Sequence, residues 1–182
     1  MKNVGIRFVL AALCILALAT VGVVLRADDD DEGTTVRAKL SGFQEAAPTP
    51  KLTAGSGEFR GRIAPDNHSL TFTLRWSNLT GAPLVAHFHF AQRGVSGAVV
   101  VNICGTPGKP ACGGATGSIT GTAVASDVQG VSAQGVAAGD FAGFLRIIRN
   151  GVSYVNIHTA TFGAGEIRGQ VKAEEEHDND RD

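Results

Sequence analysis

Two histidines in a short alternating run are the residues of this chain best suited to chemistry. His87 and His89 lie two positions apart among the apolar residues Ala86, Phe88 and Phe90. Side chains two positions apart on a strand leave the same face, with Cα atoms about 7 Å apart, so both imidazoles face away from Phe88. Two such imidazoles can chelate zinc or copper when a third ligand approaches.

His158 is the natural candidate for that third ligand. It lies near the end of a second predicted strand, residues 154–159 (YVNIHT). This strand and the one with His87 and His89 both lead through a loop into a Gly-led strand. The three histidines either bind a copper or zinc ion or are polar strand residues that hydrogen-bond neighbouring loops. In both interpretations the imidazoles lie outside the core, pointing outward or toward an overlying loop.

A second polar row follows that strand. Glu166, Arg168 and Gln170 alternate with Ile167 and other residues that we expect to face inward. Glu166 and Arg168 can form an ion pair with each other or with cross-strand partners. We favour a structural role for this row, because a buried ion pair fixes the register of a strand and leaves little freedom for catalysis. The nearest approach to an acid/base pair would be Glu166 with His158.

Cysteine use indicates an oxidising compartment. If an N-terminal signal is removed, Cys104 and Cys112 remain and flank a loop rich in glycine and proline. An even pair of this kind in an exported protein indicates a disulfide. Zinc binding by the two cysteines is the weaker interpretation, because their spacing exceeds that of a zinc knuckle and no second pair exists.

The elements that must position these residues are short strands. Apolar residues at 70, 72, 74 and 76 alternate with polar ones, which predicts a strand with one buried face. The other segments with strand character are 36–40, 59–63, 84–91, 97–103, 117–125, 152–159 and 165–173. One short helix is predicted from Phe141, Phe144, Leu145 and Ile148, with Asp140 as its cap and Gly151 at its end.

This pattern predicts an all-β fold. About eight short strands and one short helix fit an immunoglobulin-like or Greek-key β-sandwich or barrel. A parallel α/β fold would need a helix between most strands, and the sequence does not supply them.

The same segments resemble the CHRD (chordin) domain family over about residues 35–172. The parts that look like its signature are 86–89, 154–159, 165–170 and the opening run 40–45 with Pro48. The signature positions outside the histidines are Tyr154, Asn156, Glu166, Arg168 and Gln170. The resemblance implies an extracellular immunoglobulin-like β-barrel or sandwich for which no enzymatic activity is established. The growth-factor antagonism of chordin is not implied, because cysteine-rich growth-factor-binding modules are absent from the sequence.

The N-terminus has the layout of a secretion signal. Lys2 and Arg7 precede an 18-residue stretch without charge, and small residues follow at possible cleavage points. We expect residues 1–27 to be a cleaved signal peptide, with an uncleaved membrane anchor as the alternative. The protein is then secreted, periplasmic or at the cell surface, and contacts a membrane only through an uncleaved segment.

Charge is distributed unevenly along the remaining chain. Residues 28–34 and 174–182 are strongly acidic, and we expect a disordered linker and a disordered tail there. Between them, residues 35–173 form the predicted β domain with 12 Lys and Arg against 6 Asp and Glu. Nucleic-acid binding is disfavoured, because these basic residues are scattered and the acidic ends would repel phosphate.

These observations favour a binding module over an enzyme. The chain contains no G-x-S-x-G turn, no H-E-x-x-H motif and no free cysteine beside a histidine. We expect an exported non-catalytic binding or structural module that contacts protein or glycan partners outside the cytoplasm. The alternative is a copper- or zinc-binding protein that uses His87, His89 and His158 and is redox-active with copper.

Overall fold

The computed structural model describes residues 33–46 and 49–174, which form nine strands, one α-helix and three short 3-10 helices. The strands are β1 (Thr35–Ser41), β2 (Ser56–Ile63), β3 (Leu70–Ser77), β4 (Pro83–Phe90), β5 (Ala98–Cys104), β6 (Gly117–Ala123), β7 (Ser153–Thr159), β8 (Ile167–Gln170) and β9 (Lys172–Glu174). The helices are α1 (Phe141–Arg149), η1 (Gly42–Gln44), η2 (Ala125–Asp127) and η3 (Ser132–Gln134). Within these residues, no helix has the length and apolar character needed to cross a membrane.

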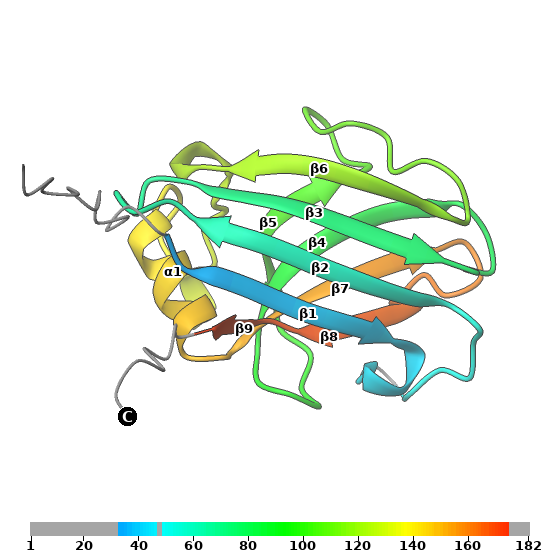
Figure 1. The fold of residues 1–182 in the computed structure, drawn as a ribbon. Coiled ribbons are helices and arrows are strands. Elements are labelled where there is room, and N and C mark those ends of the chain that lie inside the picture. The colour runs from blue at the N-terminus through cyan, green and yellow to red at the C-terminus, as the bar shows by residue number, and fades with distance from the viewer. Residues whose placement is uncertain (1–32, 47–48, 175–182) are drawn as a thin grey trace, which may run out of the picture. The chain divides into compact units, whose positions relative to one another are not determined.

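All nine strands belong to one antiparallel sheet that is nearly closed into a barrel. The strand order is β5-β4-β7-β8-β1-β2-β3-β6, and β9 pairs with β1 as well. In Figure 1 the strands β6, β3, β2 and β1 lie in front and β5, β4, β7 and β8 lie behind, while α1 lies at one end. We call these groups of strands the front sheet and the back sheet. The predicted all-β fold with one short helix is confirmed.

The core between the two sheets follows the predicted alternation. Leu70 and Leu74 of β3 are fully buried, and Phe72 and Trp76 on the same face are nearly so. Phe88 of β4 is fully buried and packs edge-on against the aromatic rings of Phe59 and Phe144, with ring centroids 5.1 and 5.3 Å away. Burial of such rings supplies much of the free energy that closes the two sheets around one core.

The helix α1 begins and ends as predicted. The Asp140 side chain accepts a hydrogen bond of 2.8 Å from the backbone N–H of Gly143, so it caps the first turn. Phe144, Leu145 and Ile148 are buried at helical spacing. Gly151 has a positive φ of 65° just after the helix, a conformation that glycine adopts without strain.

The predicted strand at 165–173 is two strands in the structure. β8 pairs with β7 and ends at Gln170. The next residue, Val171, is fully buried and donates its N–H to the carbonyl of Ser153. β9 then pairs with β1, so the chain passes from the back sheet to the edge of β1 at this bend.

Apart from residues 47–48, which include Pro48 of the opening run, the predicted domain lies within the described residues, whereas most of its flanks do not. The expected signal peptide at 1–27, most of the acidic linker and residues 175–182 of the acidic tail lie outside the described residues. Cys104 at the end of β5 and Cys112 form the predicted disulfide, with Cα atoms 5.2 Å apart. This bond closes the Gly- and Pro-rich loop.

Candidate functional site

The three histidines lie on two neighbouring strands of the back sheet. β4 carries His87 and His89, and its antiparallel neighbour β7 carries His158. His87 lies opposite Asn156 and His89 lies opposite Tyr154. Opposite residues of an antiparallel pair project from the same face, so these side chains share the face that points away from the core.

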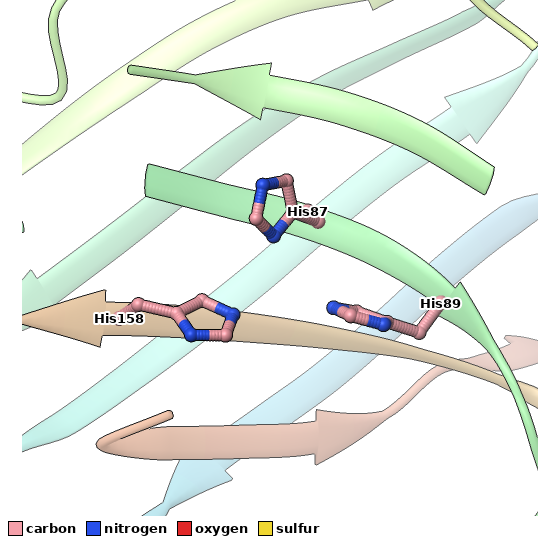
Figure 2. Close-up of side chains that lie close together, drawn as sticks. All are labelled: His87, His89 and His158. Atoms are coloured by element: carbon pink, nitrogen blue, oxygen red, sulfur yellow. The ribbon is translucent and has the colours of Figure 1, made fainter. Parts of the chain in front are cut away.

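The imidazoles converge above this face, as Figure 2 shows. Each histidine offers one ring nitrogen, and the three nitrogens all lie within 4.8 Å of one another. His87 and His89 are nevertheless only 9% and 7% exposed, and His158 is half-buried. The prediction of imidazoles outside the core is confirmed, but the outward-pointing version of it is wrong, because loops cover them.

Two of these covering loops fix the orientation of the rings. His89 Nδ1 lies 3.0 Å from the carbonyl oxygen of Gly97, and His158 Nδ1 lies 3.0 Å from that of Gly163. A carbonyl oxygen only accepts, so Nδ1 carries the proton in both rings and Nε2 keeps its lone pair. Histidines that bind metals usually donate their other ring N–H in this way.

One buried nitrogen of each ring has no hydrogen-bond partner. These atoms are His87 Nδ1, His89 Nε2 and His158 Nε2. Burial, together with the neighbouring His158 and His89, lowers the pKa of His87 to about 4. Burial also lowers the pKa of His89 to about 4 and lowers that of His158. All three rings are therefore neutral at pH 7, the form that binds metals.

A stack of three planar groups supports one side of the cluster. The ring of Tyr154 lies parallel to that of His89, with centroids 4.6 Å apart. The guanidinium carbon of Arg168 lies 3.4 Å from the centroid of the Tyr154 ring. Arg168 also donates to the carbonyls of Val95 (2.8 Å) and Gln92 (3.0 Å), so it fastens the loop before β5 over the sheet.

Glu45 is a buried carboxylate in the same polar layer, and the sequence analysis gave it no role. Its side chain accepts a hydrogen bond from the amide of Asn156 and is 5% exposed. Burial raises the pKa of Glu45 to about 7, although the nearby charge of Arg168 opposes this rise. Gly165 lets the carboxylate approach, because a Cβ there would lie 2.8 Å from the Glu45 oxygens. Glu45 and Asn156 are 111 positions apart in the sequence, so the sequence alone does not reveal their contact. The only signal was that Glu45 belongs to the opening run 40–45 of the family resemblance.

Glu166 and Arg168 do not form the ion pair that the sequence suggested. Glu166 is fully buried and accepts hydrogen bonds of 2.7 Å from each of the hydroxyls of Thr53, Thr80 and Thr159. Burial raises the pKa of Glu166, but the hydrogen bonds outweigh it and lower the pKa below its usual value. No salt bridge of Glu166 is found with Arg168 or His158 among the described residues, so the acid/base pair is not formed either. Glu166 joins three loops and strands, which is a structural role.

The cluster has the donor set of a three-imidazole metal site. Zinc lies about 2.0–2.1 Å from histidine nitrogens, which places two nitrogens about 3.4 Å apart in a tetrahedral site. The present separations of up to 4.8 Å exceed this value, so the rings would have to move closer together to bind an ion. Within the described residues no fourth His, Cys, Asp or Glu joins the group, so one coordination position would be left for water or another small ligand.

Comparison with known proteins agrees with the resemblance in the sequence. The family model described as CHRD domain matches residues 36–171 of this chain. That range contains the three histidines, the signature residues and the disulfide. Neither the curated proteins nor the solved structures give a match.

Proposed function

The chain belongs to the CHRD domain family, and from this premise we propose that it is an exported, non-catalytic binding module that holds one copper or zinc ion at His87, His89 and His158. Copper there would make the module redox-active. The module contacts protein or glycan partners outside the cytoplasm. The disulfide and the expected signal segment support the location, because structural disulfides persist in oxidising compartments.

One observation carries the metal assignment. Three neighbouring imidazoles each keep a buried nitrogen without a hydrogen-bond partner. A buried polar group without a partner costs about 1–3 kcal/mol, so three together are a considerable loss of stability. A shared metal ion would satisfy all three nitrogens at once, while the carbonyls of Gly97 and Gly163 already orient two of the rings.

Metal analysis of tag-free protein purified from its native compartment tests this proposal. We expect about one equivalent of copper or zinc, and we expect the His87→Ala/His89→Ala variant to lose it. A spectrum of the copper-loaded protein should show nitrogen coordination if the three imidazoles bind. The matched control is His68→Ala, because His68 is exposed, lies in the turn between β2 and β3 and does not belong to the cluster.

Three results would count against a metal ion at the three histidines. A metal-free wild-type protein that also fails to take up added copper or zinc would contradict the proposal. So would a double variant that folds and retains the metal. If His68→Ala loses as much bound metal as His87→Ala/His89→Ala, the ion is bound nonspecifically.

A further inference from the structure

The outward face of the front sheet is an ordered array of cations and hydroxyl groups. The cations on this face, which we call the cationic face, are Arg37, Lys39, Arg60, Arg62, Arg75 and Lys172. Their strands lie side by side in Figure 1. The strand registers align them in rows, because opposite residues of antiparallel strands share a face.

Two of the rows continue from cations into hydroxyls, whereas in a third row Glu58 lies opposite both Lys39 and Arg75. Arg37 lies opposite Arg60, which lies opposite Thr73. In the next row Arg62 lies opposite Thr71, and β6 adds further threonines beside β3. Neighbouring strands are about 4.8 Å apart, so these groups repeat at short, regular intervals across the face.

The charges on this face are only partly paired. Glu58 pairs with Arg60 at 2.8 Å, and Glu174 pairs with Arg37 at 3.2 Å. Lys39, Arg62 and Arg75 are exposed and have no ion-pair partner among the described residues. The face therefore has a surplus of positive charge, although the whole chain has a formal net charge of −1.

The face is also hollowed along its strands. A shallow groove of about 460 Å³ is lined by Arg60, Arg62 and four threonines of β3 and β6. A second hollow of about 790 Å³ lies farther along the same strands and is lined by Lys39 and Arg75, with Glu58 between them. Guanidinium groups recognise carboxylate and sulfate-like oxyanions through paired hydrogen bonds, and the threonine hydroxyls can both donate and accept.

The face lacks the groups that bind nucleic-acid bases. The aromatic residues of its strands, Phe59, Phe72 and Trp76, are buried in the core. Single-stranded nucleic acids are usually bound by stacking on exposed aromatic rings, and duplex bases are read by elements that enter a groove. A broad sheet of cations and hydroxyls offers neither feature.

We propose that the cationic face binds an anionic polysaccharide. The carboxylate or sulfate groups of the polymer pair with Lys39, Arg62 and Arg75, and its hydroxyls hydrogen-bond with the threonine rows. The proposal rests on the proposed role as a module that binds glycan, and it is independent of the metal assignment because the histidine cluster lies on the back sheet.

Binding of the full-length protein to dextran sulfate, with neutral dextran as the reference polymer, tests the proposal. We expect binding to dextran sulfate alone, with an affinity that falls as salt rises. The slope of log K against log salt is negative, and the Arg62→Thr/Arg75→Thr variant should make it less steep by about 2, at about 1 for each lost contact with an anionic group. Threonine keeps strand propensity at both positions, and circular dichroism checks that the variant folds.

The matched control removes the same charge elsewhere. Arg146→Gln/Arg149→Gln on α1 changes the net charge equally and should leave the slope unchanged. Equal slopes for the two variants, or no binding of the wild type to dextran sulfate, would overturn the proposal. Duplex DNA that binds as tightly as dextran sulfate at the same salt would overturn the choice of polysaccharide.

Discussion

At the scale of single residues, the polar layer outside the back sheet contains ionisable groups with opposite responses to pH. His87 and His89 have folded-state pKa values of about 4, whereas an unfolded histidine titrates near 6.5. The unfolded chain therefore takes up protons first, and stability falls as pH decreases from about 6.5 to 4. Glu45 acts in the other direction, because its folded-state pKa is about 7. Its contribution falls as pH rises from about 4.5 to 7.

Replacing Glu45 with glutamine isolates the carboxylate. Glutamine keeps an oxygen that can accept from Asn156 but cannot ionise, so it removes the cost of burying a charge at high pH. We expect the melting temperature of Glu45→Gln, relative to wild type, to be higher at pH 8 than at pH 5. Thermal unfolding of metal-free protein at the two values measures this. The same difference at both pH values would show that Glu45 titrates normally.

For the histidines we expect the opposite pH dependence in metal-free protein, with stability lost at low pH. We expect the free energy of unfolding of wild type to decrease between pH 6.5 and 4, and His87→Gln/His89→Gln to lose less over that interval. Urea unfolding at several pH values measures both slopes. His68→Gln is the control, because it replaces an exposed histidine in the turn between β2 and β3, outside the cluster. Parallel slopes for wild type and the double variant would contradict the lowered pKa values.

At the scale of elements, alternation was sufficient to predict strands but not their partners. Period-two burial located β3 and β4 and placed Phe88 opposite in direction to its neighbouring histidines. The pairing of β4 with β7 brings together residues about 70 positions apart, and a single sequence does not specify that register. For the same reason Glu45 and the loops that bury the imidazoles could not be predicted. Of the two kinds of partner considered for Glu166, the direct ion pair with Arg168 does not form, because three threonines from separate segments hydrogen-bond to the carboxylate instead.

The cap of α1 gives a prediction at this scale. Asp140→Ala removes the acceptor for the Gly143 N–H, so we expect a loss of about 1 kcal/mol in the free energy of unfolding. Asp140→Asn keeps an oxygen at the same place and should lose much less. Urea unfolding compares the two variants. Equal losses would mean that the charge of Asp140, rather than its hydrogen bond, stabilises the helix.

At the scale of the whole molecule, a metal ion at the histidine cluster would tie binding to folding. His87 and His89 belong to β4 and His158 belongs to β7, so an ion would join the two central strands of the back sheet. The unfolded chain does not hold these histidines together, and a ligand that binds only the folded state stabilises it by about 2.7 kcal/mol at one hundred times its Kd. Such coupling would make the site part of what stabilises the pairing of β4 with β7.

Thermal unfolding with and without metal tests this coupling. We expect added zinc or copper to raise the melting temperature of wild type by several degrees, since about 1 kcal/mol shifts a domain of this size by roughly 2–6 °C. A chelator should reverse the rise, and His87→Ala/His89→Ala should show none. An equal rise in that variant would place the stabilising ion elsewhere in the chain. No rise in wild type, despite bound metal, would mean that folded and unfolded chains bind it equally and that the three imidazoles are not a preformed site.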